Sequence, residues 1–180
     1  MENNKSSLLK HSMTYGAIIG GALIVYSLLM YFMNLHLNKV VGYLSYIVLI
    51  IGLYFSAKNY RDQELGGNIS YGQGLGYGVL VSFFCSIILA FYLFLFYKII
   101  DPDTIGKIVQ MAEDNMVEKG YTSEQISQGI VYVKKFTTPT TIALFTILGI
   151  VFYGFIFSLI ISAIVKKQTD AFDGAMHNIE

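Results

Sequence analysis

Charged residues divide the chain into four long apolar stretches. Asp, Glu, Lys and Arg are absent from residues 11–38, 40–57, 65–97 and 136–165. Each stretch reaches or approaches the ~20 residues with which a helix crosses a bilayer, and a charged side chain in hydrocarbon is costly. Strands of a membrane barrel would instead alternate over ~10 residues. The pattern therefore predicts an all-α, polytopic membrane protein with transmembrane helices at about residues 12–35, 40–57, 69–97 and 139–165.

The segment between the third and fourth spans, at about residues 101–137, has a different pattern. Asp101-Pro102 is typical of a helix start, and apolar residues then recur at helical spacing until Gly120. Thr122 and Gln125 form a capping-box pattern that begins a second helix. We expect two amphipathic helices that pack against the protein's own bundle or the membrane surface, and a partner-binding surface is the alternative.

The composition agrees with a membrane protein. Hydrophobic residues make up 54% of the 180 residues and charged residues 13%, whereas soluble domains carry about 25% charged residues. Lys plus Arg and Asp plus Glu balance at 12 each, so the charge favours membrane lipids and no nucleic acid as partners. The length suits a single membrane domain over residues 1–180.

The first apolar stretch is predicted to be a retained span, because it continues to Leu35 without a signal-peptide cleavage site. Four spans put both termini on one side of the membrane. Basic residues then number six on each side, but the long loop obeys the positive-inside rule less strictly, so we expect cytoplasmic termini. The two groups are Lys5, Lys10, Lys58, Arg61, Lys166 and Lys167 on the terminus side, and Lys39, Lys98, Lys107, Lys119, Lys134 and Lys135 opposite.

Three spans carry small residues at every fourth position, which lets membrane helices approach closely. This small-xxx-small packing face predicts contacts inside the bundle, and a sharper alternative is contact with a membrane protein partner or a homodimer. The residues concerned are Gly16 and Gly20 in the first span, Ser70, Gly72, Gly74, Gly76, Gly78, Ser82, Ser86 and Ala90 in the third, and Gly154, Ser158 and Ser162 in the fourth.

Few residues in the spans could carry chemistry. Gln73 is a candidate polar site, with a hydrogen bond to another helix as the plainer interpretation. His36 is expected at the membrane interface and Cys85 as a buried apolar residue. Because the sequence contains no recognisable nucleophile–base set, metal-ligand cluster or phosphate loop, we expect no enzymatic activity, no catalytic residues, no cofactor and no bound metal.

Three short segments resemble a bacterial family of four-span membrane proteins described as domain of unknown function 4199. They are Tyr15-Gly16-x-x-x-Gly20, Lys58-Asn-Tyr-Arg-Asp62 and Gly67-Asn-Ile-Ser-Tyr-Gly-Gln-Gly74. The resemblance extends over essentially the whole chain and implies a location in the bacterial inner membrane. It implies no activity and no catalytic residues.

Two functions fit these observations. The first is a non-enzymatic accessory subunit that interacts with a membrane assembly through the third-span face and the amphipathic loop. The second is a small transporter or flippase for a lipid-linked or amphiphilic substrate. A polar cavity that reaches the middle of the bilayer would favour the second, and a filled bundle with an exposed small-residue face would favour the first.

Overall fold

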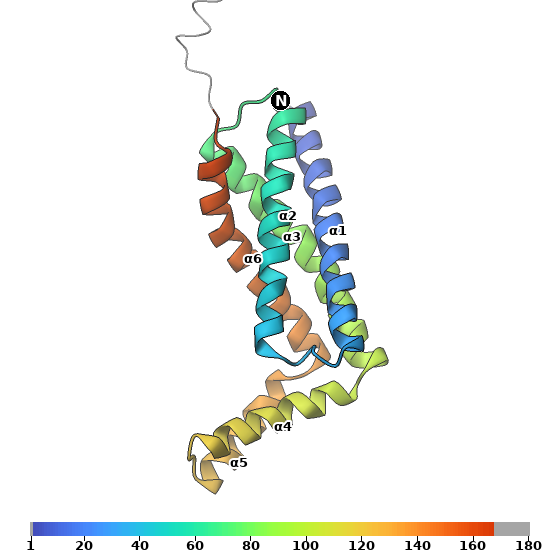
Figure 1. Cartoon of the computed structure of the whole chain (residues 1–180), viewed down its shortest axis with the longest axis vertical. Helices are drawn as coiled ribbons and strands as arrows, with labels where there is room; N and C mark the ends of the chain where they lie inside the picture. The colour runs from blue at the N-terminus through green and yellow to red at the C-terminus, as the bar shows by residue number, and fades with distance from the viewer. Residues whose placement is uncertain (1, 168–180) are drawn as a thin grey trace, which may run out of the picture.

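The structure is a computed structural model that describes residues 2–167, and within this range the chain is helical without named strands. The predicted all-α fold with four membrane-spanning helices and two further helices is confirmed (Figure 1). The elements are α1 (Glu2–Phe32), α2 (Lys39–Asn59), the π-helical turn η1 (Tyr60–Glu64), α3 (Tyr71–Leu95), the π-helical turn η2 (Phe96–Ile100), α4 (Asp103–Glu118), α5 (Ser123–Phe136) and α6 (Pro139–Val165).

The four long helices are apolar enough to cross a membrane over Ser6–Phe32, Val40–Glu64, Tyr71–Ile100 and Pro139–Val165. The second of these extends beyond the predicted residue 57, because the helix continues through Lys58 and Arg61 into η1. These charged residues occupy its last turns, where long basic side chains reach the polar edge of the bilayer. Lys58 and Arg61 therefore indicate where this span reaches the membrane interface, and the helix continues beyond that point.

Helix α3 is the central element of the bundle and packs most extensively on α6 and then on α1. Helix α2 has smaller contacts with α1, α3 and α6. Figure 1 shows α2 between α1 and α6, with α3 behind them. We call the end where α1 begins and α6 ends the terminus end, and the end with the α1–α2 turn and α4 the loop end.

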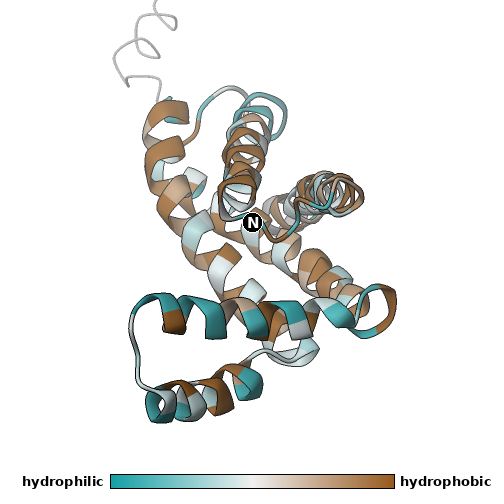
Figure 2. Ribbon diagram, turned by 60° about the horizontal axis from the view of Figure 1, so that its bottom comes forward, coloured by the Kyte–Doolittle hydropathy of each residue, from teal (hydrophilic) through white to brown (hydrophobic). Residues whose placement is uncertain are grey.

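The segment between α3 and α6 forms a hairpin of α4 and α5 at the loop end (Figure 1). Its two helices contact each other, and α4 also contacts η2, whereas the larger contacts of α5 are with α4. Figure 2 shows alternating hydrophilic and hydrophobic residues along both helices. The hairpin packs on the protein's own bundle at its two ends, through the start of α4 and through Phe136 of α5, whose ring centroid lies 6.4 Å from that of Phe145 in α6.

Local signals in the sequence explain where several helices begin. Ser70 and Thr122 each make a full capping box, with Gln73 and Gln125 respectively. Gly66 and Gly67 adopt positive φ angles of 63° and 87° in the turn before α3, a conformation that favours glycine.

Candidate functional site

A cavity of about 450 Å³ lies between the four spanning helices in the half of the bundle toward the loop end. Its inner part includes Leu23, Leu49 and Ile150, which lie near the middle of their spans. Its outer part includes Val41 and Ile142, near the starts of α2 and α6. The cavity therefore extends from one face of the membrane to about its middle.

Side chains from all four spanning helices line the cavity. Large apolar side chains from all four spans form most of its wall, which is typical of a site for an apolar or amphiphilic ligand. Two glycines, Gly42 and Gly149, also line it, and a Cβ added to either would meet no atom within 4 Å. Among the side chains that the structure describes, the lining contains no Asp, Glu, Lys or Arg.

Five hydroxyl groups belong to the cavity lining, and each makes a hydrogen bond within the protein. Tyr26, Ser45 and Thr146 donate to the backbone oxygens of Val41, Gly42 and Ile142 at 2.7, 2.6 and 2.8 Å. Ser27 Oγ accepts from the Tyr92 hydroxyl at 3.3 Å. Tyr46 shares a hydrogen bond with Tyr153.

His36 connects the cavity to the start of α4. Its Nε2 lies 3.4 Å from Thr104 Oγ1, and this hydroxyl donates to Asp101 Oδ2 at 2.6 Å. Because the single Thr104 proton goes to Asp101, His36 must donate from Nε2, so Nδ1 is the unprotonated nitrogen in the neutral ring. Nδ1 is buried and has no hydrogen-bond partner among residues 2–167.

The Asp101 carboxylate accepts the hydrogen bonds that link it to Thr104, the partner of His36. Asp101 is 9% exposed, and its Oδ1 also accepts from the backbone N–H of Thr104 at 3.2 Å. The hydrogen bond from the Thr104 hydroxyl holds the pKa of the Asp101 carboxyl below its ordinary value, and the nearby Lys107 acts in the same direction. Partial burial opposes this lowering of the pKa.

A second polar cluster lies at the terminus end, around His11. Its Nδ1 is 2.8 Å from the Tyr77 hydroxyl and its Nε2 is 3.0 Å from Asn59 Oδ1. Since Asn59 Oδ1 only accepts, Nε2 carries the proton and Tyr77 donates to Nδ1. The Tyr77 ring is fully buried and stacks on Tyr60, with centroids 4.4 Å apart. The cluster joins α1, α2, η1 and α3, and both ring nitrogens of His11 are paired within it, which suits a structural role.

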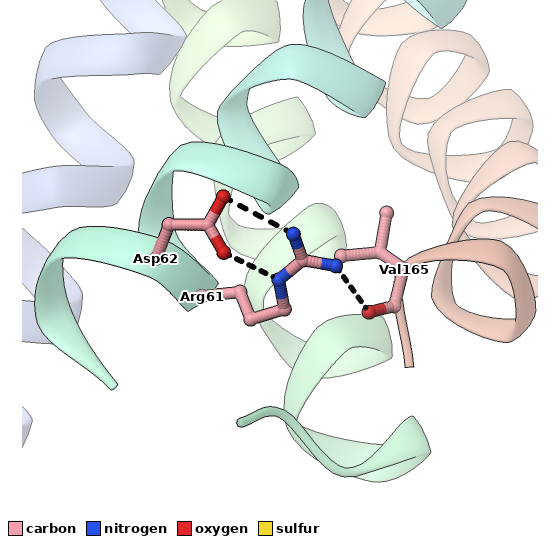
Figure 3. Close-up of polar contacts among 3 residues, drawn as sticks. All are labelled: Arg61, Asp62 and Val165. Carbon is pink, nitrogen blue, oxygen red and sulfur yellow. Dashed lines mark hydrogen bonds and ion pairs between the residues drawn. The ribbon is translucent and has the colours of Figure 1, made fainter. Parts of the chain in front are cut away.

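Arg61 adds a link from η1 to α6 (Figure 3). Its Nη1 donates to the Val165 carbonyl at 3.1 Å, while Nε and Nη2 donate to Asp62 at 2.6 and 3.1 Å. The carbonyl is one of those at the end of α6 that lack a partner within the helix. The terminus end of the bundle is thus stabilised by Asn59, Tyr60 and Arg61. These three residues belong to the segment Lys58-Asn-Tyr-Arg-Asp62, which carries part of the family resemblance.

Most of the predicted small residues lie at helix crossings. A Cβ added to Gly16 would lie 2.6 Å from Phe84 Cβ, and one added to Gly20 would lie 3.2 Å from Ile88, both on α3. Between α3 and α6, Gly74 faces Ser162, Gly78 faces Ser158 and Gly154 faces Ser82. Ser86 is buried and donates to the Phe83 carbonyl at 2.6 Å.

The remaining predicted residues have other positions. Gly72 and Gly76 are exposed, and a Cβ added to either would meet no atom within 4 Å. Ser70 is the N-cap of α3. Gln73 is exposed, and its Oε1 accepts from the Ser70 N–H at 2.9 Å, so the structure places it in the helix cap and away from the cavity.

The sequence patterns missed the residues that line the cavity. Scattered serine, threonine and tyrosine hydroxyls in apolar helices are common, and only the tertiary arrangement brings these five together. The cap formed by Ser70 and Gln73 could have been found, because Ser-x-x-Gln before an apolar run is a capping-box pattern. Within residues 2–167, no three His, Cys, Asp or Glu side chains are grouped so that they could hold a metal ion.

Comparison with known proteins gives one match. The family described as protein of unknown function (DUF4199) matches residues 14–167, which include most of the first span, the other three spans and the α4–α5 hairpin. No curated protein and no solved structure matches the chain. The match covers most of the sequence, and the chain belongs to the DUF4199 family of proteins of unknown function.

Proposed function

We propose that this membrane protein binds an amphiphile within one leaflet of the bilayer and has no catalytic activity of its own. The observation that carries the proposal is the 450 Å³ cavity among the four spans. Pockets of about 300–1,000 Å³ with apolar walls and a few polar groups are typical ligand sites. Because the cavity ends near the middle of the spans, it supports holding or presenting an amphiphile more than a path across both leaflets.

The alternative of an accessory subunit has less support from the geometry. It depended on the third-span face and the amphipathic loop. Of that face, Gly74 and Gly78 lie against α6, and Gly154 of α6 lies against α3, so the α4–α5 hairpin is the larger surface left for a partner. Gly72 and Gly76 are the small pair on an exposed part of α3. Within the third span, a homodimer or a partner helix would have to use this smaller surface.

The amphiphile proposal is tested by filling the cavity with Gly149→Leu. The added side chain has room because a Cβ at this position meets no atom within 4 Å, and leucine is the better helix former by about 1 kcal/mol. We expect the wild-type protein, extracted in mild detergent, to retain an amphiphile in native mass spectrometry. Gly149→Leu should lose most of it while remaining folded.

Gly76→Leu is the matched control, since it places the same side chain in open space on exposed α3. It should retain the amphiphile as the wild type does. Equal retention by all three proteins, or no bound amphiphile in the wild type, would contradict the proposal. A change of oligomeric size in Gly76→Leu alone would instead support contact with a partner helix.

We further propose that the protein lies in the bacterial cytoplasmic membrane with both termini in the cytoplasm. Short basic segments at the terminus end support this orientation, because the positive-inside rule acts most strongly on short loops. They include Lys10, Lys58 and Lys166. The cavity would then open from the outer leaflet.

A further inference from the structure

The hydrogen bonds around the cavity restrict the chemistry of its ligand. Tyr26, Ser45 and Thr146 each use their only hydroxyl proton on a backbone carbonyl. A hydroxyl oxygen that has donated its proton can still accept. These three groups therefore offer hydrogen-bond acceptors to a ligand and no donor.

Ser27, in contrast, can offer a hydrogen-bond donor to a ligand. Its Oγ accepts from Tyr92, so its own proton can be donated. Ser27 and Ser45 lie about 8–10 Å along their helices from the loop end, and Thr146 lies at a similar depth at 1.5 Å per residue. These four of the five lining hydroxyls thus give three acceptors and one donor at one level below the membrane surface, and the fifth, Tyr46, is paired with Tyr153.

No charged group lies at this level among the described residues. Within them, no Asp, Glu, Lys or Arg lines the cavity, and His36 uses Nε2 for its contact with Thr104. Burying an unpaired charge is far more costly than burying a hydrogen-bonded neutral group. A phosphate, carboxylate or ammonium group at this depth would therefore be disfavoured.

From this arrangement we infer that the cavity selects an uncharged amphiphile whose polar group is a hydroxyl, such as a long-chain alcohol. A ligand hydroxyl can donate to Tyr26, Ser45 or Thr146 and accept from Ser27, so it satisfies both kinds of group. A plain hydrocarbon leaves these contacts unmade, and a carboxylate lacks the proton that three of the four require. The inference rests on the proposed function and specifies the ligand class of the same site.

The test uses tryptophan fluorescence, because the natural chain contains no tryptophan. Phe145→Trp places a reporter in the cavity lining, and Phe91→Trp places one on a lipid-facing part of α3; these phenylalanines are 55% and 66% exposed. The probes are bromoundecanol, bromoundecane and bromoundecanoate at pH 8, each with a terminal bromine that quenches the fluorescence. The protein is reconstituted in phosphatidylcholine nanodiscs, and the Phe91→Trp protein corrects for simple partitioning.

After this correction, we expect the alcohol to quench the Phe145→Trp reporter at about threefold to tenfold lower concentration than the alkane, as one hydrogen bond would give. The carboxylate should be the weakest of the three. Ser45→Ala with Thr146→Val in the reporter protein removes two of the three acceptors, so it should reduce the advantage of the alcohol while leaving the alkane unchanged. The comparison among probes in the reporter protein alone already decides the question if this double variant fails to fold.

Three other results would contradict the inference, and one of them would also contradict the proposed function. If alcohol and alkane quench the cavity reporter alike, and both exceed the lipid-facing reporter, the hydroxyl selection is overturned while amphiphile binding stands. If the carboxylate is strongest, the ligand class is wrong. If all three probes quench both reporters equally, the cavity holds only bulk lipid, and both the inference and the proposed function fail.

Discussion

Asp101 illustrates how a single residue connects the spans to the segment that follows them. Its carboxylate accepts from both the backbone and the hydroxyl of Thr104 at the start of α4, and Thr104 in turn contacts His36 in the α1–α2 turn. The sequence predicted a helix start with Asp101 as the N-cap and Pro102 as the first helical residue; α4 begins one residue later, at Asp103 with Pro102 as its N-cap. The contact with His36 could not be predicted, because it joins positions 68 residues apart.

The lowered pKa of Asp101 makes a prediction for acid stability. A carboxyl whose pKa is lower in the folded state stabilises the fold above its ordinary value of about 3.9, and this contribution disappears as the pH falls through the folded-state pKa. Asp101→Asn should therefore be less stable than the wild type at neutral pH, and the difference should shrink as the pH falls below about 4. Thermal unfolding in detergent across this range measures it.

Asp103→Asn is the control, since Asp103 is an exposed carboxylate on the same helix. It should follow the pH dependence of the wild type. If Asp101→Asn and Asp103→Asn give the same curve as the wild type, the Asp101 carboxylate contributes nothing to folding.

At the scale of elements, the α3–α6 contact shows what the spacing of small residues can predict. Residues four apart lie on one face of a helix, and Gly74, Gly78 and Ser82 do lie together against α6. The same spacing could not distinguish Gly72 and Gly76, which are exposed. Which face of a helix meets a neighbour depends on the whole bundle, and a repeat of small residues is compatible with either face.

Gly78 and Gly76 form a matched pair for testing this contact. A side chain at Gly78 would collide with Ser158 of α6, whereas one at Gly76 enters open space. We expect Gly78→Leu to lower the free energy of unfolding by about 1–3 kcal/mol, as overpacking does, and Gly76→Leu to leave it unchanged or slightly higher. Denaturant titration in detergent measures both, and equal stability of the two variants would contradict the packing.

At the scale of the whole molecule, the positions of the spans were predictable because charge and apolar length are strong signals in a membrane. The cavity was not, since residues from four helices that lie far apart in the sequence form it together. The orientation of the protein in the membrane is a separate property, which we predicted from the basic residues of short segments. It is tested by labelling one position at each end of the bundle. Gln128 on the α4–α5 hairpin and Lys58 at the terminus end are exposed on opposite ends of the bundle.

Cysteine labelling at these two positions distinguishes the orientations. The native Cys85 is fully buried, so it should not react with a membrane-impermeant maleimide. We expect Gln128→Cys to react in intact spheroplasts and Lys58→Cys to react only after the membrane is permeabilised. The reverse pattern would place the termini outside the cytoplasm.

The glycine and serine contact between α3 and α6 also has a consequence for conformational entropy. Large side chains lose rotamer freedom when they are fixed in a helix interface, whereas glycine has no side chain to immobilise. In the pairs of Gly74 with Ser162 and Gly154 with Ser82, only one of the two partners therefore has rotamers to lose. The entropy cost of joining α3 to α6 is lower at these positions than it would be between two large side chains.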